Sequence, residues 1–329
     1  LKFQPLESLG FRGSYSTGFR VPTFNQLYNG VTDSPYTGAG VPDPLTCPSG
    51  VVSAATGCAA ITFNTLFGGV RDLGPEKSKV ANVGILWQPA REFSATLDWW
   101  SISRDGTIQA LGVTGANGFI QNYALFSNRF LRNSSGAVTY IDTSWINAGE
   151  TRTKGLELVL RGSAKAGSAT LNAGLDGSYL LEKKSRLVNS APFGASEVGV
   201  FTRSSELGIR WKHSAFIALT DGDWTTTLRQ QYTGGYAGYV PPGVASGAAA
   251  ATATNFAALV QPYTLHHLSL QYTGFKNTSI ILGVKNLMNV DPPFANSYDT
   301  NTGSGSSWEP RVADPRGRSY VLTVDYKFF

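Results

Sequence analysis

Apolar and polar residues alternate along many segments of this chain. Between Phe93 and Trp99 every second residue is apolar, and the last eleven residues, SYVLTVDYKFF, repeat the pattern. A period of two places successive side chains on opposite faces of a β-strand. Each such segment therefore predicts a strand with one apolar face and one mostly polar face.

About ten segments carry this pattern, and short turns alternate with long loops between them. The expected turns are 89–91, 165–167, 221–223 and 274–277. The expected long loops lie near 21–74, 106–149, 182–200, 237–262 and 291–316. We expect the first of them to be irregular throughout.

The alternation of short and long connections separates two fold classes. A soluble β-sandwich does not need loops longer than about 15 residues at every second connection. Outer-membrane barrels do combine short periplasmic turns with long extracellular loops. The pattern predicts an all-β, antiparallel transmembrane β-barrel in a bacterial outer membrane, with lipid against its apolar face. A soluble β-domain is the alternative.

Composition favours a barrel over a helical membrane protein. Charged residues make up 15% of the chain and aromatic residues 12%, and there are 37 glycines. No stretch reaches the roughly 18 apolar residues of a membrane-spanning helix. Leu1 begins within a strand pattern, so a targeting segment is expected to be upstream or already removed. The net charge of +5 comes from scattered Lys and Arg, which argues against a nucleic-acid partner.

Two cysteines, Cys47 and Cys58, lie in one loop rich in proline and glycine. No histidine or third cysteine is close enough in sequence to suggest a zinc site. The pair therefore predicts a disulfide and an oxidising compartment. Two unpaired thiols are the alternative.

Five short motifs, in order along the chain, resemble those of one family. They are SYSTGFRVPTFNQLY (14–28), LGPEKSKVANVGI (73–85), TRTKGLELVLRGS (151–163), LGVKNLMNVDPPF (282–294) and GRSYVLTVDYKFF (317–329). Together they resemble the strand motifs of TonB-dependent outer-membrane receptors. Two departures are Gln26, where the family usually has an acidic residue, and Asn82-Val83, where Glu is frequent.

The resemblance implies a barrel of about 22 strands with a plug inside it. This chain holds about ten C-terminal strands and shows no plug. The partners it implies are the remaining strands and plug, TonB through an upstream region, and an extracellular small-molecule or peptide ligand. The chain is therefore expected to be a fragment or to be completed by a partner. The family's terminal assembly signal corresponds to Tyr320, Tyr326, Phe328 and Phe329.

Two groups of residues are candidates for function. Charged residues on the polar faces of the strands are expected to point into the lumen; they are Asp98, Glu157, Arg161, Asp176 and Arg229. There they would pair with one another or with a plug, or else contact substrate. Aromatic and cationic residues of the long loops are ligand candidates: Tyr28, Tyr36, Arg71, Tyr123, Trp145, Tyr236, Tyr239 and Trp308.

The resemblance implies active import of a scarce nutrient, such as a siderophore, cobalamin, a glycan or a peptide, with energy from TonB. No catalytic triad spacing, phosphate loop or zinc signature occurs, so we expect no enzyme activity, no cofactor and no metal. One alternative is a self-contained ten-stranded barrel enzyme resembling the omptin proteases, with His266 or His267 as the base. Another is a structural or adhesive barrel that presents its loops.

Overall fold

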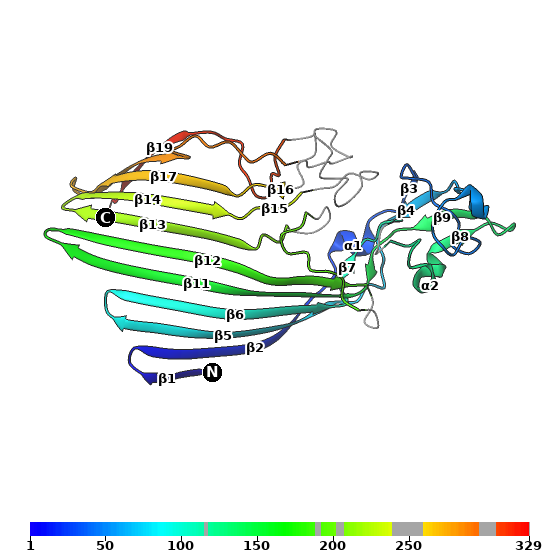
Figure 1. Cartoon of the computed structure of the whole chain (residues 1–329), viewed down its shortest axis with the longest axis horizontal. Helices are drawn as coiled ribbons and strands as arrows, with labels where there is room; N and C mark the ends of the chain where they lie inside the picture. The colour runs from blue at the N-terminus through cyan, green and yellow to red at the C-terminus, as the bar shows by residue number, and fades with distance from the viewer. Residues whose placement is uncertain (115–117, 188–191, 202–206, 239–258, 296–306, 329) are drawn as a thin grey trace.

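An antiparallel sheet of eleven strands dominates the computed structural model (Figure 1). The structure describes residues 1–114, 118–187, 192–201, 207–238, 259–295 and 307–328. The strands, in their order across the sheet, are β1 (Lys2–Leu6), β2 (Leu9–Arg20), β5 (Glu76–Ala90), β6 (Phe93–Asp105), β11 (Glu150–Ala166), β12 (Ala169–Arg186), β13 (Trp211–Asp221), β14 (Trp224–Thr233), β17 (Tyr263–Tyr272), β18 (Thr278–Lys285) and β19 (Ser319–Tyr326).

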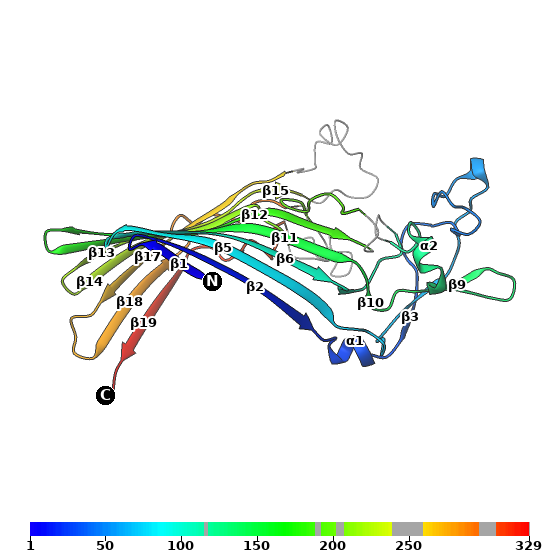
Figure 2. The ribbon, with the colours of Figure 1, turned by 90° about the horizontal axis from the view of Figure 1, so that it is seen from below.

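The sheet is curved and open. Figure 2 shows it as an arch, with the central strands at the crown and β2 and β19 on the two flanks. Within the described part of the chain, β1 and β19 are edge strands that do not pair with each other. Lipid does not tolerate unpaired strand edges, so an arch of this kind fits part of a larger barrel.

Cross-strand pairing shows that the two faces of the sheet differ as the alternation predicts. One row runs through Arg12, Gly84, Asp98, Glu157 and Ser178, and we call the side on which it lies the polar face. The neighbouring row lies on the opposite side, the apolar face, and consists of Val83, Trp99, Leu156, Tyr179 and Trp211. Because register is preserved across six strands, each face keeps its character from strand to strand.

Short turns lie at one end of the sheet and long connections at the other (Figure 1). Gly167 and Gly222 occupy two of the turns with φ of 64° and 55°, a left-handed conformation that glycine adopts without strain. The structure adds β1 to the strands expected from sequence. It also extends β12 to Arg186, beyond the expected start of the third long loop at 182.

The first two long loops are not irregular, contrary to the expectation for 21–74. They form a second sheet of four short strands in the order β3 (Thr32–Pro35), β4 (Asn64–Phe67), β9 (Val138–Asp142) and β8 (Phe130–Arg132). The β4–β9 pair is parallel and joins the two loops directly. We call the loop segments 21–75 and 106–149 together the loop unit.

The loop unit has its own hydrophobic core. Phe119 and Ile141 are fully buried there, and Val41, Phe63 and Phe130 pack around them. Its other elements are α1 (Phe24–Tyr28), η1 (Ala54–Thr56), β7 (Ile108–Gln109), α2 (Tyr123–Phe126), η2 (Ser127–Arg129) and β10 (Ile146–Asn147). Residues from both loops contribute to this core, so each loop is folded against the other.

A smaller cluster covers the long-connection end of the later strands. Leu207, Ile209 and Ala295 pack there with residues of β15 (Tyr236–Ala237) and β16 (Leu259–Val260). Within the described ranges, no helix has the length and apolar character needed to cross a membrane.

Candidate functional site

An ion pair between Arg12 of β2 and Asp98 of β6 lies on the polar face, toward the β1 edge of the sheet. The Arg12 guanidinium donates two hydrogen bonds to the carboxylate, one of them from Nε to Oδ1 at 2.7 Å. The pair reaches across β5 above Gly84, where an added Cβ would lie 1.9 Å from Oδ1 of Asp98. A glycine at this position therefore permits the contact, and Asp98 is only 5% exposed.

The other predicted lumen-facing charges also lie on the polar face, and each has a partner within the chain. Glu157 accepts hydrogen bonds from Nε1 of Trp100 at 3.2 Å and from the Ser178 hydroxyl at 2.9 Å. Arg161 donates to both carboxylate oxygens of Asp176, at 2.7 and 2.9 Å. Arg229 donates to the Ser214 hydroxyl at 3.0 Å.

A second ion pair, which the sequence analysis did not single out, lies where β2 and β5 reach the loop unit. Arg20 donates to both carboxylate oxygens of Glu76, at 2.8 and 2.9 Å. The backbone N–H of Ile108 donates to the same carboxylate at 2.8 Å. Arg20 and Glu76 belong to the first two family-like motifs, so these motifs carry a contact that anchors both long loops.

The same first motif also starts a helix. Thr23 accepts a hydrogen bond from the backbone N–H of Gln26, and the Gln26 side chain accepts one from the backbone N–H of Thr23. This reciprocal arrangement is a capping box, which satisfies two N–H groups at the start of α1. Gln26, a departure from the family pattern, therefore fulfils the capping function that a glutamate can also fulfil.

The loop aromatics and cations that were ligand candidates occupy different environments. Tyr28 is half exposed and lies against Arg71, whose guanidinium carbon is 5.8 Å from the ring centroid. Trp145 is partly exposed and contacts Phe67. Trp308 is also partly exposed. Tyr239 lies outside the described residues.

The remaining three candidates pack inside the protein. Tyr36 stacks on Phe63 with ring centroids 4.8 Å apart. Tyr123 packs edge-on against Phe130. Tyr236 is 5% exposed, and burial raises the pKa of its hydroxyl to about 12. These rings contribute to packing, so the structure does not present them as open contact surface.

Arg132 and Asp43 connect the two halves of the loop unit. Arg132 donates to both carboxylate oxygens of Asp43, at 2.6 and 2.7 Å, and also contacts the Tyr123 hydroxyl at 3.4 Å. These hydrogen bonds hold the pKa of Asp43 below its usual value of 3.8, although burial opposes the shift. The predicted disulfide, between Cys47 and Cys58, is present in the same half of the loop unit as Asp43.

A groove of about 480 Å³ lies on the polar face at the long-connection end, between β13, β14, β17 and the segment 310–315. Lys212, Gln231 and Tyr263 line it from the strands. The Tyr263 hydroxyl donates to the carbonyl oxygen of Asp314 at 3.2 Å, which holds the segment over the strand. Hydrogen bonds from Arg316 lower the pKa of Asp314 to about 2, so this wall of the groove stays ionised.

The two adjacent histidines point in opposite directions. His266 lies on the apolar face, 3.2 Å from Gln230. His267 lies on the polar face, where Nδ1 accepts the N–H of Asn286 at 3.1 Å and Nε2 is 3.2 Å from Gln231. They cannot act together on one substrate. Among the described residues, no group of three His, Cys, Asp or Glu side chains is placed to hold a metal.

Comparison with known proteins identifies the fold. The sequence profile described as "TonB dependent receptor-like, beta-barrel" matches residues 1–287. This chain belongs to the TonB-dependent receptor family. It is accordingly an outer-membrane protein of a Gram-negative bacterium, and its family is one of transport receptors. Comparison with curated proteins gave no match.

Solved structures of the same fold include siderophore receptors. A variant of the ferric enterobactin receptor PfeA from Pseudomonas aeruginosa has 15% identity and a TM-score of 0.64, covering 99% of this chain and 39% of that one. The siderophore receptor PirA from Acinetobacter baumannii has 18% identity and a TM-score of 0.61, covering 99% and 40%. The copper transporter OprC has 14% identity and a TM-score of 0.53, covering 99% and 38%. This chain therefore spans about two fifths of the length of these receptors.

Proposed function

We propose that this chain is part of a receptor barrel that imports a ferric siderophore with energy supplied by TonB. In this arrangement the long connections lie outside the cell and the short turns in the periplasm. The observation that carries the proposal is the groove at the long-connection end of the polar face. A ligand caught by the outer loops would meet this groove as it enters the lumen.

Asp314, the carboxylate that lines the groove, is already paired with Arg316, so the ammonium group of Lys212 is the charge that favours an anionic, oxygen-rich ligand. Lys212 projects from β13 into the groove, and within the described part of the chain no carboxylate lies within 4.0 Å of its ammonium group. Gln231 and Thr233 add neutral hydrogen-bonding groups beside Lys212. Ferric siderophore complexes present oxygen donors and are frequently anionic, so they match this lining better than neutral glycans do. Siderophore receptors among the structures of the same fold support the same class.

The test is uptake by the full-length receptor in cells that lack other siderophore receptors. We would measure accumulation of ⁵⁵Fe from a panel of ferric siderophores, with labelled cobalamin, glycans and peptides as alternative substrates. We expect accumulation of at least one ferric siderophore, and its loss when TonB is deleted. Failure to accumulate any panel member with an intact TonB system would contradict the import function. Accumulation of cobalamin, a glycan or a peptide alone would replace the substrate class and keep the function.

A matched pair of variants tests the groove itself. Lys212→Gln removes the ammonium group, and we expect siderophore binding to weaken by about tenfold or more, because a charge-assisted hydrogen bond contributes roughly 1.5–3 kcal/mol. Lys165→Gln changes an exposed lysine at the short-turn end and should leave binding unchanged. Equal binding by both variants would place the ligand elsewhere.

A further inference from the structure

The apolar face changes character abruptly toward the long-connection end. On β5 the exposed residues Trp87, Ile85 and Val83 are followed on the same face by Lys79 and Lys77. Equivalent changes occur on β11 and β12. We call the six basic residues beyond this boundary the cationic patch; they are Lys77, Lys79, Arg152, Lys154, Lys184 and Arg186.

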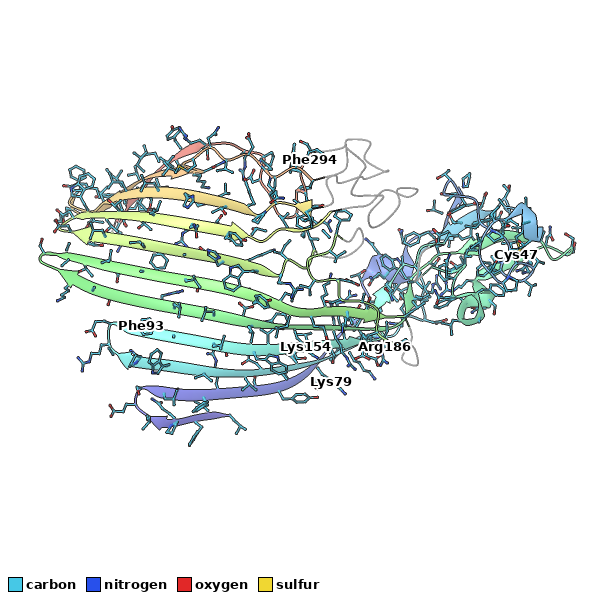
Figure 3. All side chains as sticks on the ribbon, in the orientation of Figure 1. Cys47, Lys79, Phe93, Lys154, Arg186 and Phe294 are labelled. Atoms are coloured by element: carbon cyan, nitrogen blue, oxygen red, sulfur yellow. A yellow bond between two sulfur atoms is a disulfide. The ribbon has the colours of Figure 1, made fainter. Side chains whose placement is uncertain are left out.

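Cross-strand register places the six side chains on one surface. Lys79, Ser103, Arg152 and Lys184 are consecutive partners across β5, β6, β11 and β12. Two rows flank this one on the same face. The first contains Lys77, Asp105, Glu150 and Arg186, and the second contains Ser101, Lys154 and Glu182. Figure 3 shows Lys79, Lys154 and Arg186 near one another at the long-connection end, whereas Phe93 lies at the opposite end of the sheet.

The carboxylates on this surface do not balance its cations. Glu150 pairs with both Arg152 and Arg186, and Glu182 pairs with both Lys154 and Lys184. Asp105 is the third acidic residue of these rows. Within the described ranges, no carboxylate comes within 4.0 Å of the ammonium group of Lys77 or Lys79.

Like charges also face each other directly. Arg152 on β11 is the cross-strand partner of Lys184 on β12. Like charges in this relation destabilise a strand pair, and the cost falls when an anion binds between them. Glu150 and Glu182 offset part of this repulsion, and the positive charge that remains along the row favours an external anion.

An open groove accompanies the cations. It has a volume of about 890 Å³, and its lining includes Thr17 and Phe19 of β2, Lys77 and Lys79, Ser103 and Arg152, and the acidic residues Asp105 and Glu150. Glu150 is already paired with Arg152 and Arg186, so the donors beside the exposed Phe19 ring are the ammonium groups of Lys77 and Lys79 and the hydroxyl groups. This combination suits a phosphate group attached to an apolar body.

The depth of the cationic patch in the membrane matches that of a lipid headgroup. Trp99 lies on the apolar face at the end of its apolar run, in the position of an interfacial aromatic residue. Ser103, in the central row of the patch, is four residues further along β6, which is about 13 Å of strand. At the usual barrel tilt of about 45° this is about 9 Å along the membrane normal, within the headgroup layer.

We propose that the cationic patch binds the phosphate groups of a phosphorylated lipid of the outer leaflet. The apolar face below the patch contacts the acyl chains, and Lys77 and Lys79 provide the donors not already paired with a carboxylate. The proposal rests on the outward orientation of the long connections, part of the proposed function. It does not depend on which nutrient is transported.

The experiment uses the full-length receptor in lipid nanodiscs, with bisphosphorylated lipid A and its dephosphorylated form as probes. Native mass spectrometry counts the lipid A molecules that remain bound. We expect retention of the bisphosphorylated lipid, about tenfold weaker retention of the dephosphorylated lipid, and weakening as salt rises. Equal retention of the two lipids would overturn the proposal, and this comparison needs no variant.

A second arm separates the lipid from free phosphate and locates the site. Inorganic phosphate at millimolar concentration should not displace the lipid, because it lacks the apolar contact; full displacement would identify a site for free phosphate instead. The double variant K77Q/K79Q should bind the bisphosphorylated lipid about tenfold more weakly. The control K165Q/K276Q, at the short-turn end, should bind it normally. Normal binding by K77Q/K79Q would overturn the assignment to this patch.

Uptake measurements on the same variants keep the two proposals distinct. If K77Q/K79Q loses lipid retention and still imports the ligand, the patch binds lipid independently of transport. If the receptor imports nothing and still retains phosphorylated lipid through Lys77 and Lys79, the lipid site stands and the import function fails.

Discussion

Glu76 at the start of β5 joins Arg20, at the end of β2, to the backbone of β7 in the second long loop. Arg20 is also the last residue before the first long loop. A single carboxylate thus fixes the base of both loops to the barrel. It is 4% exposed, so its loss leaves the buried backbone N–H of Ile108 without an acceptor.

We expect Glu76→Gln to loosen the base of the loop unit. The variant removes the negative charge that Arg20 faces. Because Arg20 is half exposed, we expect the loop unit to lose only about 2 kcal/mol of stability. Limited proteolysis within 106–149 should become faster, whereas the barrel strands should stay protected. The control is Glu7→Gln at the exposed β1–β2 turn. Unchanged cleavage of Glu76→Gln relative to this control would contradict the anchoring function.

Gly84 makes room for the Arg12–Asp98 pair. Gly84→Ala would place a methyl group 1.9 Å from Oδ1 of Asp98, so the ion pair must move or break. We expect the free energy of unfolding to fall by about 2–3 kcal/mol. Heated gels should show this as a lower unfolding temperature of the barrel. Gly10→Ala is the matched control, because its new Cβ would meet only the Cβ of Leu86 at 3.8 Å. Similar shifts in both variants would contradict the explanation.

The Asp43–Arg132 pair makes the loop unit sensitive to acid. The folded-state pKa of Asp43 is below its usual 3.8, so the pair stabilises the unit above about pH 4. The stabilisation is lost as pH falls through the lowered pKa. The protection factors of amides in 32–35, 64–67 and 138–142, corrected for the intrinsic exchange rate at each pH, should therefore fall below pH 4. Asp43→Asn should show lower protection factors at pH 7 and a smaller further fall in acid. A pH response identical to that of the unmodified protein would sink this assignment.

The disulfide stabilises a part of the loop unit rather than the barrel. Cys47 and Cys58 close a loop with a sequence separation of 11 residues. The chain-entropy relation gives a little under 3 kcal/mol for a loop of this size. The double variant Cys47→Ser/Cys58→Ser should increase proteolysis within 41–63 and leave the unfolding temperature of the barrel unchanged. A large fall in that temperature would show that the loop unit and barrel unfold together.

The large sheet could be predicted from sequence because its signals are local. Alternation in segments such as 93–99 and turn residues such as Gly167 lie within a few positions of one another. The family resemblance, confirmed by the profile over 1–287, added the outer-membrane location. The disulfide was also predicted correctly.

The loop unit could not be predicted because its contacts are distant in sequence. Asn64 of β4 pairs with Tyr140 of β9, and each of these strands is too short to show a convincing period. The same distance hid the partners of the site residues. Asp98 was expected to face the lumen, but its partner Arg12 lies 86 residues earlier. The only local signal for that contact is the glycine at position 84.

The shared core of the loop unit has a consequence for evolution and engineering. Val41 and Phe63 come from the first long loop, whereas Phe119 and Ile141 come from the second. Neither loop can be exchanged alone between receptors without leaving the other's apolar side chains mismatched. The two loops should therefore diversify together, and a chimera that transfers the recognition surface needs both segments as one graft.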